Sequence, residues 1–92
     1  MAEGAEVFSS HEGFTIRALA MPEYSPHGPG VKFGYVAHVC RPGADTRYAD
    51  KVVRFAHPVH DFASATAAEE AAFNEGRSII DGTHASLNAK GL

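Results

Sequence analysis

The sequence predicts an α+β domain, a three-stranded antiparallel meander sheet with one C-terminal helix packed on one face (βββα). Three observations lead to this fold class. Three segments have the alternation or the β-branched and aromatic content of strands, their connections are short, and helical periodicity appears only after them. At 92 residues the chain has the length of one domain. We expect a flexible segment over 1–12, the α+β domain over 13–82 and a tail over 83–92, which Leu87 either pins to the body or leaves disordered.

The first expected strand covers 14–21, between Gly13 and Pro22, and alternates apolar with polar positions. Residues 22–30 contain three prolines and two glycines and are predicted to form a loop. The second expected strand, 31–40, has the clearest pattern. One of its faces carries Val31, Phe33, Tyr35, Ala37 and Val39.

A third strand is expected over 48–56, after a turn at 41–45, with Val53 and Phe55 facing the same way as Phe33 and Tyr35. Residues 57–61 are expected to end this strand and lead to the helix.

The helix is expected between Ser64 and Gly82. Thr66 and Glu69 form a capping box, and Ser64 is a competing first cap. Gly82 is the expected end. An apolar stripe at helical spacing is predicted to cover the sheet, with Gly76 allowing close approach. Its members are Ala68, Ala72, Phe73, Gly76, Ile79 and Ile80.

Charge, cysteine count and hydropathy argue against several classes of protein. The net charge is -3 with neutral histidines, which argues against a dedicated nucleic-acid binder, and protonation of all six histidines would bring it to -3 + 6 = +3. The single cysteine excludes an internal disulfide and a multi-cysteine zinc site in one chain. The acidic start resembles no targeting signal, and no apolar run has the length of a membrane span. We therefore expect a cytoplasmic protein without a membrane segment.

Several short motifs give the chain a resemblance to a known group of proteins. They are Gly-Phe-Thr-Ile at 13–16, Val-Cys-Arg-Pro-Gly at 39–43, Val-Arg-Phe at 53–55 and Glu-Gly-Arg-Ser-Ile-Ile-Asp-Gly at 75–82. With them the chain resembles a group of short, uncharacterised β-proteobacterial proteins of the Burkholderia and Ralstonia type, and this resemblance implies no activity and no site residues. The order of elements also resembles the partial double-stranded-RNA-binding fold of HicB-like antitoxins. However, Glu69 and Glu70 stand where an RNA-reading helix would carry lysine or arginine.

Two clusters of side chains are candidates for a metal site or a catalytic site. His57, His60 and Asp61 offer two imidazoles and a carboxylate for a divalent metal, with His38 or Cys40 as a further ligand. The competing interpretation is a solvated loop in which Asp61 accepts backbone amides, and we predict no bound metal and no cofactor. Cys40 lies two residues from His38 on one side of a strand, which is too far for direct proton transfer, so a packing thiol is favoured over a nucleophile.

The sheet face turned away from the helix is the remaining candidate, because it mixes cations with apolar side chains. The predicted interaction face consists of Arg17, Leu19, Lys32, Val36, His38, Val52 and Arg54. We expect a non-enzymatic protein-interaction or homodimerising module, with association weakening below about pH 6 as His38 gains charge. The alternatives are a nucleic-acid-binding regulator, which this face disfavours because it offers no aromatic residue, and a small metal-dependent enzyme.

Overall fold

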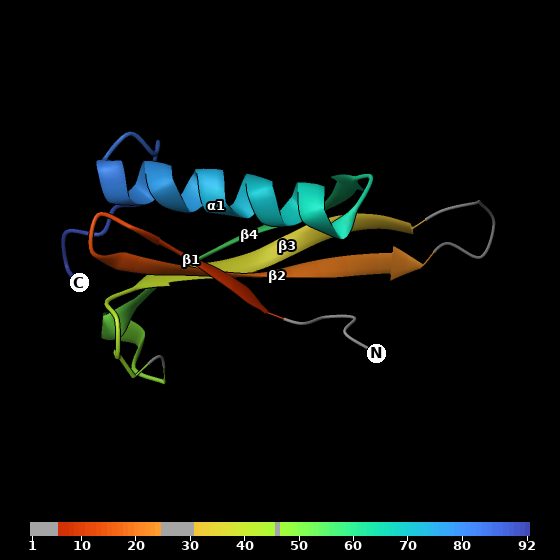
Figure 1. The fold of residues 1–92 in the computed structure, drawn as a ribbon. Coiled ribbons are helices and arrows are strands. Elements are labelled where there is room, and N and C mark those ends of the chain that lie inside the picture. Colours follow the sequence, from red (N-terminus) through yellow and green to blue (C-terminus); the bar gives the residue numbers. More distant parts are fainter. Residues whose placement is uncertain (1–5, 25–30, 46) are drawn as a thin grey trace.

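A computed structural model of the chain describes residues 6–24, 31–45 and 47–92. Four strands form one antiparallel meander sheet in the order β1-β2-β3-β4, and one long helix lies across a single face of it (Figure 1). The elements are β1 (Val7–His11), β2 (Phe14–Tyr24), β3 (Val31–Cys40), the short 3-10 helix η1 (Ala49–Lys51), β4 (Val52–Phe62) and α1 (Ala65–Asp81). The predicted α+β class, the meander order and the single packed helix are confirmed. The predicted number of strands is wrong, because a fourth strand precedes the expected three.

The additional strand, β1, comes from the segment that the sequence assigned to a flexible lead-in. It forms a hairpin with β2, in which His11 pairs with Phe14 and Val7 pairs with Ala18. Glu12 and Gly13 are the two loop residues, and both have positive φ, 51° and 81°. Positive φ at both positions suits the right-handed twist of a two-residue hairpin. Glu12 is the only non-glycine residue with positive φ in the described part of the chain.

The strand predicted over 14–21 is longer in the structure and continues through Pro22 to Tyr24. A proline is tolerated in a strand where its missing N–H faces no partner. In the described structure β1 pairs with β2 only as far as Ala18, so Pro22 lies beyond that ladder. The rest of the predicted loop, residues 25–30, lies outside the described residues.

The third predicted strand is displaced towards the C-terminus, because η1 precedes it and residues 57–61 continue it instead of ending it. The register of β3 and β4 shifts between two pairs, Tyr35 with His57 and Phe33 with Phe62, so β4 bulges at this point by three extra residues. Gly34 makes the bulge possible. A Cβ atom at position 34 would overlap the carbonyl oxygen of His57, so only glycine lets the two backbones approach this closely.

The helix begins two residues earlier than a capping box at Thr66 requires. Ser64 is the N-cap, and its Oγ accepts a hydrogen bond from the Ala67 amide at 3.1 Å. Ser64 therefore takes the role first expected of Thr66. At the other end Gly82 adopts φ 82°, and its amide donates to the Ser78 carbonyl oxygen, as predicted for the end of the helix.

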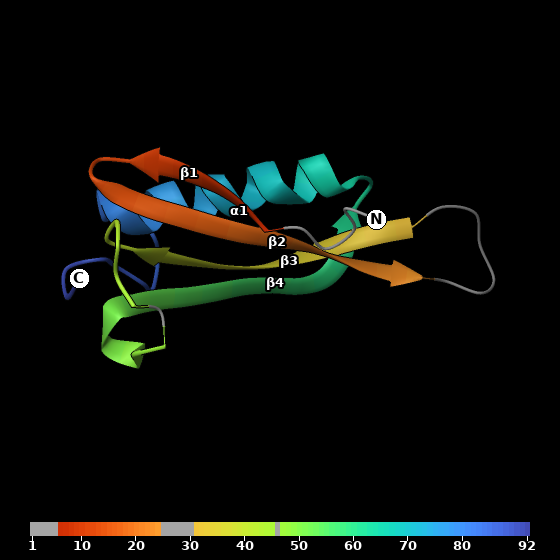
Figure 2. The same cartoon turned by 60° about the horizontal axis from the view of Figure 1, so that its bottom comes forward.

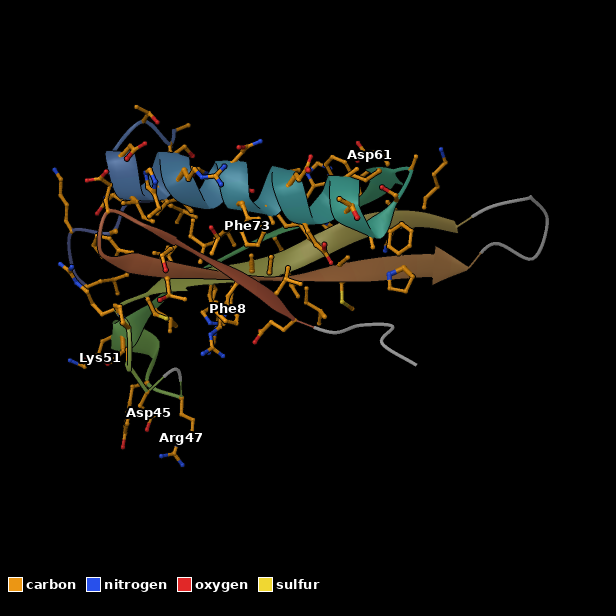
Figure 3. All side chains as sticks on the ribbon, in the orientation of Figure 1. Phe8, Asp45, Arg47, Lys51, Asp61 and Phe73 are labelled. Atoms are coloured by element: carbon orange, nitrogen blue, oxygen red, sulfur yellow. The ribbon has the colours of Figure 1, made fainter. Side chains whose placement is uncertain are left out.

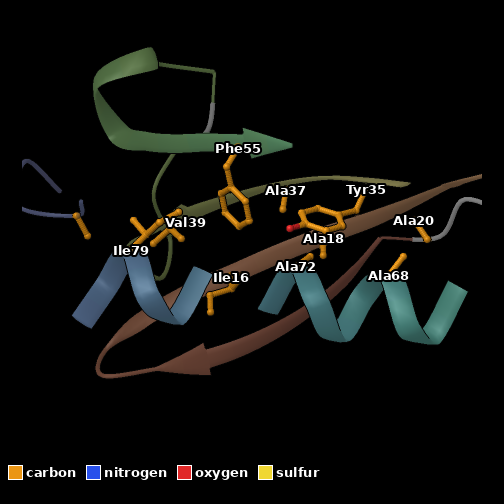
Figure 4. Close-up of a cluster of buried hydrophobic side chains, with 11 residues drawn as sticks. Ile16, Ala18, Ala20, Tyr35, Ala37, Val39, Phe55, Ala68, Ala72 and Ile79 are labelled. Carbon is orange, nitrogen blue, oxygen red and sulfur yellow. The ribbon is translucent and has the colours of Figure 1, made fainter. Parts of the chain in front are cut away.

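The core lies between α1 and the sheet, and small residues dominate its helical side (Figure 4). Ala68, Ala72, Gly76 and Ile79 are buried, whereas Phe73 and Ile80 are only partly buried. The expected close approach at Gly76 is confirmed, because an added Cβ there would lie 2.7 Å from Cγ2 of the fully buried Ile16. On the sheet side, Tyr35 and Phe55 meet edge to face, with ring centroids 6.3 Å apart.

Residues 83–92 fold back against the core, and Leu87 packs against it. Of the two expectations for this segment, the pinned arrangement is therefore confirmed. His84 organises it. Its Nδ1 accepts hydrogen bonds from the amides of Ser86 and Leu87, at 3.1 and 3.0 Å. The proton of the neutral ring is therefore on Nε2, which lies 2.9 Å from a carboxylate oxygen of Glu75 on the helix.

Candidate partner-binding face

The face of the sheet away from α1 is called the open face here. Strand register aligns its side chains in rows across the sheet. His38 of β3 pairs with Arg17 of β2 on one side and with Arg54 of β4 on the other. These three residues are called the basic row. Directly opposite residues in antiparallel strands have Cβ atoms about 4.5–5.5 Å apart, so three basic groups lie next to one another.

Apolar side chains flank the basic row. The next row along the strands consists of Leu19, Val36 and Ala56, and Met21 lies beyond it on β2. Val36 is 43% exposed and Met21 40% exposed, although both are apolar. A contiguous exposed surface of this composition is typical of a contact site.

Phe8 of β1 lies at the end of the basic row, because it pairs with Arg17 of β2. Its side chain is 72% exposed and lies on the side of the sheet opposite the helix, whereas Phe73 points towards the sheet (Figure 3). The sequence-based expectation of no aromatic residue on this face is therefore wrong. Phe8 was missed because β1 was not predicted.

One end of the open face is covered. The connection between β3 and β4, including η1, lies on this side of the sheet (Figures 1 and 2), and the labels of Asp45, Arg47 and Lys51 mark its position in Figure 3. Val52, which was predicted to be an exposed member of the interaction face, is only 8% exposed. The accessible surface therefore begins at the basic row and extends away from this connection.

The open face is hollowed next to the basic row. A groove of about 590 Å³ is lined by Glu6, Leu19, Val36, Ala37, His38, Arg54, Phe55 and Ala56. Nε2 of His38 is buried and has no hydrogen-bond partner among the described residues. Burial, with smaller effects of Arg17 and Arg54, lowers the pKa of His38 from its ordinary value, whereas Glu6 opposes this shift. At neutral pH the basic row therefore combines two permanent cations with a neutral imidazole.

Glu6 is the acidic residue of this groove. Its Oε1 lies 3.4 Å from a guanidinium nitrogen of Arg17, and both side chains are about half exposed. Of the cations predicted for the open face, Arg54 also lines the groove, whereas Arg17 and Lys32 are not among its lining residues. The sequence did not predict a role for Glu6, because the residue was assigned to the lead-in and its place beside β2 follows only from the hairpin.

The residues that the sequence offers as candidate metal ligands, His57, His60 and Asp61, are brought together only in part. His57 Nε2 lies 3.1 Å from an Asp61 carboxylate oxygen, and the His57 ring stacks on Tyr35 with centroids 5.5 Å apart. Within residues 6–24, 31–45 and 47–92, no group of three His, Cys, Asp or Glu side chains is arranged to hold a metal ion. His57 and Asp61 form a hydrogen-bonded pair beside the ring of Tyr35, and His60 does not join them in a group that could hold a metal ion.

Cys40 lies on the same side of β3 as His38 and is buried. Burial raises the pKa of the Cys40 thiol, which lowers the thiolate fraction at neutral pH. Burial and the raised pKa both disfavour the thiolate form that a nucleophilic cysteine needs. On the helix side, Tyr35 donates a hydrogen bond to Glu75, and burial together with this bond raises the pKa of Tyr35. Glu75 therefore joins the sheet, the helix and His84.

Searches of protein-family models, of curated proteins and of solved structures found no match to this chain. In the described part of the chain, no helix has the length and apolarity needed to cross a membrane.

Proposed function

We propose that this chain is a non-enzymatic interaction module, and that its open face binds a protein partner rich in acidic groups. The observation that carries the proposal is the basic row, which lies directly beside exposed apolar side chains on the face that α1 leaves open. Cations beside an apolar surface suit a partner that offers carboxylates and aliphatic groups together.

The size of the face fits a reversible complex. With strands about 4.8 Å apart and a rise of about 3.3 Å per residue, three strands of ten or eleven residues and one of five present at most about 600 Å². Two partners would then bury at most about 1,200 Å², the lower limit of standard-size specific interfaces. We therefore expect moderate affinity and rapid exchange.

The charge of the open face favours an acidic partner over a second copy of the chain. Two copies packed face to face would bring Arg17, Lys32 and Arg54 of one copy towards the same residues of the other, and like charges in an interface cost free energy. Protonation of His38 changes the affinity in opposite directions for the two kinds of partner. It adds repulsion between two copies, so self-association weakens at low pH, whereas it adds attraction to an acidic partner, so that complex becomes tighter.

The test measures light scattering of the chain alone and fluorescence polarisation of labelled probes at pH 5.5 and 7.5 with constant ionic strength. The probes are a capped hexapeptide of alternating Glu and Leu, its Lys-Leu counterpart and a single-stranded oligodeoxynucleotide. We expect a monomer that binds the Glu-Leu peptide, and binds it more tightly at pH 5.5. Val36→Glu abolishes this binding, whereas Val59→Glu, at a valine that is 61% exposed outside the two rows, does not.

A concentration-dependent dimer that Val36→Glu dissociates would replace the acidic partner with a second copy. Preferential binding of the oligonucleotide would favour the nucleic-acid alternative, for which Phe8 beside Arg17 is the specific supporting feature. A monomer that binds none of the probes would refute the proposal.

A further inference from the structure

The groove beside the basic row has the attributes of a carboxylate site. His38 and Arg54 line the groove from neighbouring strands, Arg17 lies beside His38 on β2, and His38 Nε2 is buried without a hydrogen-bond partner among the described residues. A buried polar atom without a partner costs free energy, and an anionic ligand that accepts a hydrogen bond from the Nε2–H of the imidazole removes that cost. Leu19, Val36 and Ala56 supply an apolar wall beside it, and a volume of about 590 Å³ accommodates a carboxylate with an adjoining aliphatic group.

A carboxylate of the chain already lies at this site. Glu6 lines the groove and contacts Arg17 through Oε1. At 3.4 Å the contact is longer than a strong charge-assisted hydrogen bond, and both groups are accessible to solvent, so the pair is weak. Glu6 also precedes Val7, the first residue of β1 that pairs with β2, so its side chain can leave Arg17 without breaking the hairpin ladder.

We propose that Glu6 is a built-in competitor, which occupies the carboxylate site of the open face until an acidic–aliphatic segment of a partner displaces it. This inference rests on the proposed function and adds a regulatory step to it. The partner replaces Glu6 at Arg17 and gains His38 and Arg54 as further contacts, because these two residues line the same groove. Neutralising Glu6 therefore increases affinity, both by removing the competitor and by removing repulsion between two carboxylates.

The experiment measures the Kd of the capped Glu-Leu hexapeptide at low and high salt for four proteins: the full chain, Glu6→Gln, Glu70→Gln and Arg54→Gln. Glu6→Gln and Glu70→Gln change the net charge equally, from -3 to -2, but Glu70 is an exposed helix residue that does not line the groove. We expect Glu6→Gln to tighten binding about fivefold at low salt and less at high salt, Glu70→Gln to change it less than about twofold, and Arg54→Gln to weaken it about tenfold.

A second readout needs no ligand. Because Glu6 opposes the lowering of the His38 pKa, the His38 ring should titrate at lower pH in Glu6→Gln and not in Glu70→Gln, as followed by NMR. If the full chain binds the peptide and Arg54→Gln weakens binding, but Glu6→Gln behaves as Glu70→Gln does, the competitor role is wrong and the proposed function stands. If no protein binds the peptide, both are wrong.

Discussion

Gly76→Ala tests how closely α1 approaches the sheet. On helix propensity alone, replacing an interior glycine by alanine stabilises a helix by about 1 kcal/mol. Here the new methyl group would lie 2.7 Å from Cγ2 and 3.0 Å from Cδ1 of Ile16, which is fully buried and branched at Cβ, so it cannot turn away. Overpacking of this kind costs about 1–3 kcal/mol, so we expect a net loss of about 1 kcal/mol in the free energy of unfolding.

Urea denaturation followed by circular dichroism measures this change. Ile16→Ala provides the matched background, because it removes the three side-chain atoms that the new methyl group would meet. It should cost about 2–5 kcal/mol by itself, and in that background Gly76→Ala should become neutral or stabilising. Glu70→Gly, at an exposed position of the same helix, measures the propensity term alone. If Gly76→Ala stabilises the otherwise unchanged protein by about 1 kcal/mol, as propensity alone requires, the tight contact with Ile16 is refuted.

Three further predictions concern local features. Ser64→Ala should lower the free energy of unfolding by about 1 kcal/mol and Thr66→Ala by less than half of that, as urea denaturation would detect; the reverse order would move the cap back to Thr66. Glu12→Asn should raise the free energy of unfolding by about 0.5–1 kcal/mol and thereby the melting temperature, because asparagine tolerates positive φ better than glutamate does. An unchanged melting temperature would count against the two-residue turn. The folded-state pKa of His38 lies below its ordinary value, so the unfolded chain binds more protons near pH 6, and stability falls as pH drops through about 6.5. His38→Gln should reduce that fall in acid denaturation, and an unchanged pH dependence would contradict it.

The elements that the sequence predicts are those with strong local signals. Strand β3 has a long alternating pattern, and α1 has a continuous apolar stripe with Gly82 at its end. Strand β1 has neither, because it is short and half of it is polar, and its hairpin turn is Glu12-Gly13 where Asn-Gly or Asp-Gly would give the strong signal. The extension of β4 through Pro58 also goes against local preference and follows from the contact with Gly34, which a local pattern does not contain.

The same distinction holds for the candidate site. Alternation within β2 and β3 correctly assigns Arg17, Val36 and His38 to the face away from the helix. It does not assign Phe8 or Glu6, because those residues reach the face only through pairing of a strand that was not predicted. The burial of Val52 depends on the path of the connection before it, which alternation does not describe.

The bulge of β4 has a consequence for how this domain behaves at high concentration. An outer strand with regular unpaired amides and carbonyls invites any other extended chain to pair with it, and such pairing leads to aggregation. In this sheet one outer strand, β1, has five residues, and the other, β4, has an irregular register and contains Pro58, which has no N–H to donate. Growth by addition of strands is therefore disfavoured at both borders. Partner recognition then depends on side chains of the open face. Side chains distinguish one partner from another, whereas backbone hydrogen bonds at a sheet edge pair with any extended chain.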